Sequence, residues 1–192
     1  MYRRAIRAAA EKVFGEVGYA EAKMADIAAE AGVATGTLYN YFSSKEEIFT
    51  SISTALRGEL IDEIQLILGE PEPLARLRAM SRTAMTFLER HGRVFLAYMD
   101  LGWDPKGLHS ATTEAERDMD RMFEQMTESI LVEAANAGQV RNDIDPIVLA
   151  RGLGGIINAN IVGWAREGCP PGLVDKVDSI YELFLSGAQP RE

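Results

Sequence analysis

Apolar residues recur at spacings of three and four along nearly the whole chain, and the strict alternation typical of strands is almost absent. Alanine, leucine, glutamate and arginine are abundant, and all four are good helix formers. Clusters of glycine and proline interrupt the pattern at intervals. The sequence therefore predicts an all-α fold of about nine helices, at roughly 2–16, 24–31, 35–41, 44–68, 73–90, 93–102, 109–137, 146–167 and 171–187.

Two of these helices begin with a recognisable cap. Ser43 is predicted to cap the helix at 44–68, with Glu46 reaching back to complete a capping box. Asp145 precedes Pro146, which places a cap before a proline at the first helical position, where the missing N–H costs nothing.

Hydrophobic residues make up 47% of the 192 residues, which is ample for a buried core. No apolar run approaches the roughly 20 residues that span a bilayer, and the first residues lack the apolar stretch of a signal peptide. We therefore expect a cytoplasmic protein without a membrane partner. The single cysteine, Cys169, excludes an internal disulfide and a cysteine-based metal cluster, and no metal or cofactor is predicted.

The formal net charge of −9 argues at first against a nucleic-acid partner. Residues 1–60, however, hold seven Lys or Arg and eight Asp or Glu, against 13 and 21 in residues 61–192. The N-terminal part is thus nearly neutral, and a DNA-binding face needs a few well-placed cations rather than a basic whole. We interpret the acidic remainder as a solvated surface.

The segment 23–42 is predicted to form two short helices around a tight turn. Ala28 is small where a second helix must cross closely, and Gly32 stands where the chain must leave the first helix in a left-handed conformation. Leu38 and Phe42, four residues apart, give the second helix an inward face. This combination of residues meets the steric demands of a helix-turn-helix.

The outward face of the second helix then carries hydroxyls and an amide, which can meet base edges and phosphates. Its residues are Thr35, Gly36, Thr37, Tyr39, Asn40 and Tyr41. Lys45 follows shortly afterwards and can neutralise a phosphate. The alternative is an ordinary helical hairpin with a polar face, in which Tyr39 and Tyr41 are partly buried aromatics.

Residues 5–50 carry a known pattern of residues at fixed spacing. The matching positions are Ala8-Ala9, Phe14, Gly18-Tyr19, Asp26-Ile27-Ala28, Ala31-Gly32-Val33, Gly36-Thr37-Leu38-Tyr39, Tyr41-Phe42 and Ser44-Lys45-Glu46-Glu47. The segment resembles the N-terminal domain of TetR-family regulators, whereas the rest of the chain matches only loosely. The resemblance implies a helix-turn-helix DNA-binding domain at 1–48 and a ligand-binding and dimerisation domain at 49–192. It also implies a homodimeric repressor that a small-molecule effector releases from operator DNA.

Carried over by position, the resemblance places the predicted outward face in the major groove, with Tyr41 and Lys45 on the DNA backbone. Two departures from the family pattern change the expected contacts. Ala22-Lys23 stands where family members usually have a threonine or serine pair, and Ala34 replaces a usual serine. We expect Lys23, and Thr35 as a helix cap, to replace the contacts that are lost.

Small residues form one stripe on the helix predicted at 146–167, and such a stripe lets another helix approach closely. They are Gly152, Gly155, Ala159 and Gly163. The resemblance implies that the last two helices form the dimer interface, and we add Ile180 and Phe184 to it. Close packing within one subunit is the alternative.

The resemblance further implies an effector cavity lined by the helices between 73 and 167. Aromatic rings, adaptable methionines and one amide that needs a partner are the candidate lining. These candidates are Phe95, Tyr98, Met99, Trp103, Met122, Met126, Asn158 and Trp164. A plain hydrophobic core accounts for the same pattern.

Two other functions compete with the regulator hypothesis. The chain has neither a Gly-Xaa-Ser-Xaa-Gly motif nor a phosphate-binding loop, so no catalytic residue is predicted, although a spatial dyad of Cys169 with a histidine stays open. The second alternative is a helical DNA-binding or interaction protein without an effector, which would lack an enclosed cavity. Activation in place of repression is a variant of the main hypothesis.

Overall fold

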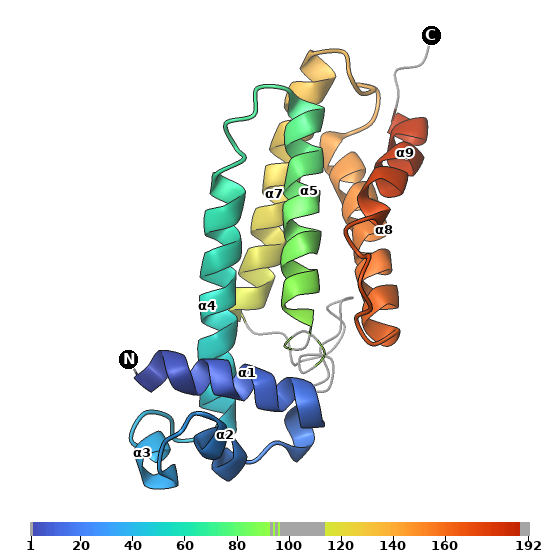
Figure 1. Ribbon diagram of the computed structural model, residues 1–192. Coiled ribbons are helices and arrows are strands. Elements are labelled where there is room, and N and C mark those ends of the chain that lie inside the picture. Colours follow the sequence, from blue (N-terminus) through green and yellow to red (C-terminus); the bar gives the residue numbers. More distant parts are fainter. Residues whose placement is uncertain (1, 93, 95, 97–113, 189–192) are drawn as a thin grey trace. The chain divides into compact units, whose positions relative to one another are not determined.

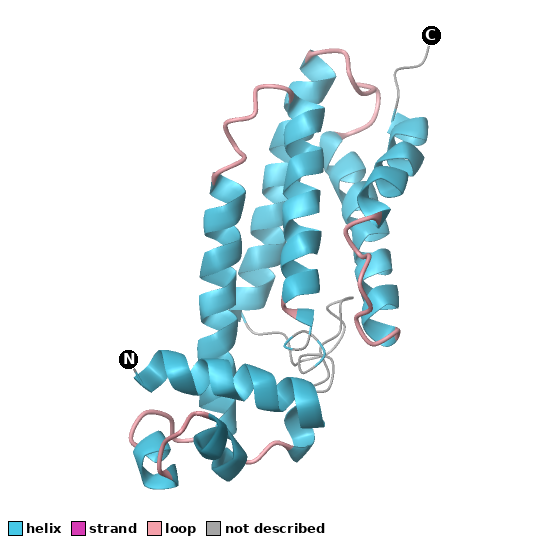
Figure 2. Cartoon of the chain, in the orientation of Figure 1, coloured by secondary structure: helices cyan, strands magenta, loops and turns pink. Residues whose placement is uncertain are grey.

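The computed structural model describes residues 2–92, 94, 96 and 114–188, and every regular element within these ranges is a helix (Figures 1 and 2). The helices are α1 (Tyr2–Glu21), α2 (Met24–Glu30), α3 (Thr35–Tyr39), α4 (Lys45–Gln65), α5 (Pro73–Arg90), α7 (Glu114–Asn136), α8 (Pro146–Arg166) and α9 (Lys176–Ala188). The all-α prediction is confirmed. The helix expected at 93–102 lies almost wholly outside the described residues.

The helix boundaries differ from the prediction where glycine or proline behaves differently from expectation. α1 runs to Glu21 because Gly15 stays helical, and only Gly18 leaves the helical region, with φ 79° and ψ 160°. α9 begins at Lys176 rather than near 171, because the two prolines before Gly172 and the positive φ of 106° at that glycine form a turn first. The predicted Asp145 cap is confirmed, since its carboxylate accepts a hydrogen bond from the Ile147 N–H at 3.1 Å.

The chain divides into two compact units. Unit 1 comprises Met1–Asp62 and His91–Trp103, and unit 2 comprises Glu63–Arg90 and Asp104–Glu192. The chain passes from the first to the second inside α4, between Asp62 and Glu63.

The core of unit 1 is built from the inward faces of its helices. Its fully buried aliphatic side chains are Ile6, Ile27, Leu38, Ile48 and Ile52. Beside them the rings of Phe14, Tyr19 and Phe49 pack at an angle to one another, with centroid separations of 5.2, 5.2 and 6.0 Å. Tilted and edge-on contacts of this kind add to the stabilisation that burial alone provides.

Unit 2 is a helical bundle in which α7 packs against α5 and α8, and α9 packs against α5 and α8. A buried hydrogen bond of 2.8 Å between the hydroxyls of Ser81 and Tyr181 joins α5 to α9. Burial raises the pKa of Tyr181, so its phenol stays neutral. At the C-terminal end of α9, the backbone N–H of Arg141 donates to the Ala188 carbonyl at 2.8 Å.

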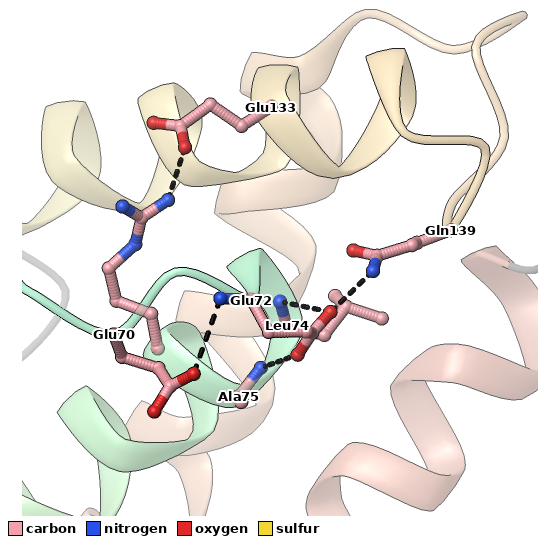
Figure 3. Close-up of polar contacts among 7 residues, drawn as sticks. Glu70, Glu72, Leu74, Ala75, Glu133 and Gln139 are labelled. Atoms are coloured by element: carbon pink, nitrogen blue, oxygen red, sulfur yellow. Dashed lines mark hydrogen bonds and ion pairs between the residues drawn. The ribbon is translucent and has the colours of Figure 1, made fainter.

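The start of α5 is held by carboxylates (Figure 3). Glu72 accepts hydrogen bonds from the backbone N–H groups of Leu74, at 3.3 Å, and Ala75, which are two of the donors left open at a helix N-terminus. The same carboxylate accepts from the side-chain amide of Gln139, just beyond the end of α7. Arg76, one helical turn after Glu72, forms an ion pair with Glu133 of α7. Side-chain contacts therefore fix the start of α5 against the end of α7.

We expect Tyr181→Phe to lower the free energy of unfolding by about 1 kcal/mol, because the variant removes one buried hydrogen bond and leaves the Ser81 hydroxyl with only its 3.2 Å bond to the Leu77 carbonyl. Urea unfolding measures the change. Tyr39→Phe is the matched control, since the Tyr39 side chain is 52% exposed and should lose almost nothing. Equal losses in the two variants would contradict the assigned contribution.

Candidate nucleic-acid interface

The turn between α2 and α3 has the geometry of a helix-turn-helix. Gly32 adopts the left-handed conformation with φ 67°, and its N–H donates to the Ala29 carbonyl at 3.1 Å. The following N–H, of Val33, donates to the Ala28 carbonyl at 3.0 Å, which closes the end of α2. A Cβ atom at Gly32 would meet nothing within 4 Å, so backbone conformation rather than space requires glycine there.

The predicted outward face is open to solvent. Thr35, Gly36, Tyr39 and Asn40 are exposed, while Thr37 and Tyr41 are half-buried. The inward residues Leu38 and Phe42 are 0% and 1% exposed, as the spacing of four predicted. Within unit 1, the face from Thr35 to Asn40 is therefore available to a partner.

Tyr41 is held by the first turn of α1, a contact that sequence reasoning missed. Its ring centroid lies 5.7 Å from that of Tyr2, and the Arg3 guanidinium lies 4.8 Å from the ring centroid of the neighbouring Phe42. Tyr41 also packs partly against the core of unit 1. No spacing rule links residues about 40 positions apart, so only the fold brings them together.

The starts of α2 and α3 differ from the expected capping. Ala34 is the N-cap of α3 and Lys23 that of α2, and neither side chain forms a capping hydrogen bond. Thr35, predicted as the cap, is instead the first helical residue. The prediction was wrong by one position, because Ala34 already has the extended backbone, with φ −66° and ψ 144°, of the residue before a helix. Lys23 itself is exposed.

The capping box of α4 is displaced by one residue from its predicted position. The Ser44 hydroxyl accepts the Glu47 N–H at 3.2 Å, and the Glu47 carboxylate accepts the Ser43 N–H at 2.7 Å. The hydrogen bonds that the Glu47 carboxylate accepts from the N–H and the hydroxyl of Ser43 lower the pKa of Glu47. Because α4 begins at Lys45 and not at residue 44, Ser44 caps the helix in place of Ser43, and Glu47 in place of Glu46 reaches back, to the N–H of the residue before the cap.

Lys45 is directed into its own subunit. Its ammonium donates hydrogen bonds to the carbonyls of Tyr19, at 2.7 Å, and Ala20, at 3.0 Å. The same nitrogen lies 4.5 Å from the centroid of the Tyr19 ring. Two of its three N–H groups are therefore used at the end of α1, which the prediction of a phosphate contact did not anticipate.

Known proteins with similar sequences share this organisation. Residues 6–52 match the family model described as "Bacterial regulatory proteins, tetR family". Along 97% of the chain, the sequence is 26% identical to the fatty acid metabolism regulator protein of Bacillus subtilis, of which 94% is covered. The chain belongs to the TetR family of regulators. The resemblance found in the sequence is thereby confirmed.

Further TetR-family proteins align with most of this chain. The transcriptional repressor KstR2 of Mycobacterium tuberculosis (strain H37Rv) is 25% identical over 84% of this chain and 80% of its own length. The crystal structure of the regulator FadR from Bacillus subtilis in complex with stearoyl-CoA has the same fold, with a TM-score of 0.75 at 23% identity, covering 97% of this chain and 99% of that one. This TetR-family chain is a DNA-binding transcriptional regulator, as predicted.

The candidate effector residues fall into three groups. Phe95, Tyr98, Met99 and Trp103 lie outside the described residues. Met122 and Met126 on α7 and Asn158 on α8 are half-buried in unit 2. Trp164 is 1% exposed, and its ring N–H donates to the Pro170 carbonyl at 2.6 Å, so this side chain holds the turn after α8.

The stripe of small residues on α8 faces outward from unit 2. Gly152, Gly155 and Ala159 are exposed and Gly163 is half-buried, and a Cβ atom on any of the three glycines would meet nothing within 4 Å. Close packing against the residues that the structure describes therefore does not explain them.

Two residues of α9 do not lie on the surface that was predicted for the dimer partner. Ile180 and Phe184 are 4% and 7% exposed, because they fill the core of their own unit. The apolar side chains that α9 and α8 do expose are Leu183, at 64%, and Val148, at 56%. Helical periodicity gave the correct apolar stripe on α9 but not the side to which it turns.

Proposed function

We propose that this TetR-family regulator is a cytoplasmic homodimeric repressor whose hold on operator DNA is released by a small-molecule effector. The observation that carries the proposal is the polar, solvent-exposed face of α3, held outward by the buried side chains of Leu38 and Phe42. Dimerisation follows from the geometry of DNA, in which successive major grooves lie roughly 34–36 Å apart and take one recognition helix each.

In this proposal, different residues contact the base edges and the phosphates of the DNA. Thr35, Gly36, Thr37, Tyr39 and Asn40 approach base edges in the major groove. Tyr41 and Lys23 contact phosphates, which position the protein but carry no sequence information. The exposure of Asn40 and Lys23 supports this division, since neither side chain is used in the core of unit 1.

We expect Asn40→Ala to weaken operator binding by about tenfold or more, because an asparagine amide that pairs with an adenine edge contributes roughly 1–3 kcal/mol of discrimination. An operator selected from random duplexes by the wild-type protein is the ligand, and fluorescence anisotropy measures its affinity. Asn142→Ala, at an exposed asparagine of unit 2, is the matched control. The face is wrongly assigned if both variants bind like the wild type.

The dimer surface that we propose is the exposed side of α8 and α9. α8 is long and apolar enough, by length and composition alone, to cross a membrane, yet only 22% of its most apolar 18 residues are buried in the chain. One such helix is weak evidence for a membrane span. An apolar helix with an exposed row of Gly152, Gly155 and Ala159 suits close contact with the same helix of a second subunit.

Gly155→Leu should weaken the dimer by about tenfold to a hundredfold, since a bulky side chain in a tightly packed contact costs roughly 1–3 kcal/mol. We expect the subunit itself to tolerate the change, because a Cβ atom at Gly155 meets nothing within 4 Å among the described residues. Sedimentation equilibrium measures the dissociation constant. Gly58→Leu on α4 has the same freedom from neighbours and serves as the control. An unaltered dimer in the Gly155 variant would remove α8 from the interface.

The effector class that we propose is a long-chain acyl-CoA. Support comes from the full-length similarity to the Bacillus subtilis fatty acid regulator and from the stearoyl-CoA bound to a protein of the same fold. The candidate contacts are Met122, Met126 and Asn158, together with Phe95, Tyr98, Met99 and Trp103. An effector releases DNA only by binding more tightly to the state that fits the operator poorly. α4 contains one of the places where the chain passes between the two units, and through it unit 2 would influence unit 1.

Saturating stearoyl-CoA should lower the affinity for the selected operator by about tenfold, the scale of a typical coupling free energy. Anisotropy titrations with and without the thioester measure the effect, and free CoA and stearate are the controls. Binding of stearoyl-CoA without any change in operator affinity would contradict its role as effector. Release by free CoA alone would place recognition in the nucleotide part and not in the acyl chain.

We propose no enzymatic activity for the chain. The relatives are transcription regulators. Burial raises the pKa of the Cys169 thiol to about 11, so the thiol is protonated at neutral pH and is a poor nucleophile.

A further inference from the structure

One contact joins the two chain segments that flank the helix-turn-helix. Lys45, the first residue of α4, donates hydrogen bonds to the carbonyls of Tyr19 and Ala20 at the end of α1, at 2.7 and 3.0 Å. The residues joined are 26 and 25 positions apart in sequence. Everything between them is α2, the turn at Gly32, α3 and the short segment before α4. We call this contact, of the Lys45 ammonium with the two carbonyls and the Tyr19 ring, the clasp.

The end of α1 is suited to hold a cation. Gly18 interrupts the helix, and carbonyl groups near a helix C-terminus lack intrahelical partners and carry partial negative charge. Hydrogen bonds from an ammonium to such carbonyls are stronger than neutral ones. The face of the Tyr19 ring, 4.5 Å from the nitrogen, adds a cation–π contact.

The Tyr19 ring of the clasp is fixed in the core of unit 1. Tyr19 is only 6% exposed and packs against Phe14 and Phe49 at centroid separations of 5.2 Å. Lys45 therefore joins the start of α4 to a ring that is itself anchored in the core of unit 1.

The other lysines of unit 1 behave differently. Lys12 forms a 2.8 Å ion pair with Glu30 on the surface, where both side chains are substantially exposed. Lys23 is exposed, and its side chain forms no hydrogen bond or ion pair with any residue that the structure describes. Lys23 is thus available to a phosphate, whereas most of the hydrogen-bonding capacity of Lys45 is directed inward.

We propose that Lys45 is a positioning residue for operator binding, which closes the base of the helix-turn-helix through the clasp and does not act by neutralising a phosphate. α3 has five residues, and a helix so short has no stability of its own, so its orientation depends on what holds the two ends of the segment that contains it. Releasing the clasp returns conformational freedom to that closed segment. The inference rests on the DNA face proposed above.

The first test uses the protein without DNA. Lys45→Met keeps the apolar stem and removes the donors, and we expect backbone amides of α2 and α3 to exchange at least about tenfold faster while those of unit 2 are unchanged. Lys45→Arg, which keeps a cation and several donors, should restore most of the protection. Lys12→Met is the matched control with unchanged exchange in α3. Hydrogen exchange followed by mass spectrometry reads all three variants.

The second test measures operator affinity as a function of salt. Each phosphate contact contributes about 0.9 to the slope of log affinity against log salt, so losing one contact in both subunits of the dimer reduces the slope by about 1.8. We expect Lys45→Met to weaken binding by about tenfold with an unchanged slope, and Lys23→Met to lower the slope. If Lys45→Met fails to fold, Lys45→Gln, which retains one amide donor group, replaces it in both tests.

Wild-type exchange in α2 and α3 of the Lys45→Met variant, or a slope reduced by about 1.8, would overturn the inference. Failure of the proposed DNA face is a separate outcome: it shows as wild-type operator affinity in Asn40→Ala and Lys23→Met, and it leaves the exchange result on the DNA-free protein standing.

Discussion

A helix of five residues does not persist in water by itself, so α3 exists only because neighbouring segments hold it. Leu38 and Phe42 anchor its inner side in a core that α1, α2 and the start of α4 share. The turn at Gly32 sets the angle at which it leaves α2. The burial of two side chains thereby places a row of polar residues in solvent, and the proposed DNA contacts depend on that constraint.

The sequence predicted this arrangement well because each part of it is local. The small residue, the glycine and the inward pair in the segment 23–42 lie within a few positions of one another, where helical geometry alone relates them. The open face of Asn40 and its neighbours follows directly once the buried side is known. The Asp145 cap was predictable for the same reason, since cap and helix are adjacent in sequence.

What the sequence did not reveal depends on distant segments or on a shift of one residue. The contact of Tyr2 with Tyr41 and that of Lys45 with Tyr19 cross long stretches of chain, and no periodicity encodes them. Ser43 and Ser44 are equally good caps, so only the observed start of α4 distinguishes them. On α9, the spacing of apolar residues locates a stripe, but the packing of α5 and α8 decides that Phe184 turns inward and Leu183 outward.

The same physical distinction separates functional candidates throughout the molecule: a side chain already satisfied by its own chain has little left for a partner. The ring N–H of Trp164 donates to the Pro170 carbonyl, and the side chain of Phe184 is buried in the core. Gly155 and the side chain of Asn40, by contrast, are exposed to solvent. Sequence patterns and the family resemblance made all four candidates, whereas hydrogen bonding and burial distinguish them. A cation follows this rule as strictly as an apolar group does, because an ammonium that caps a helix gains less from a phosphate than one that is still fully hydrated.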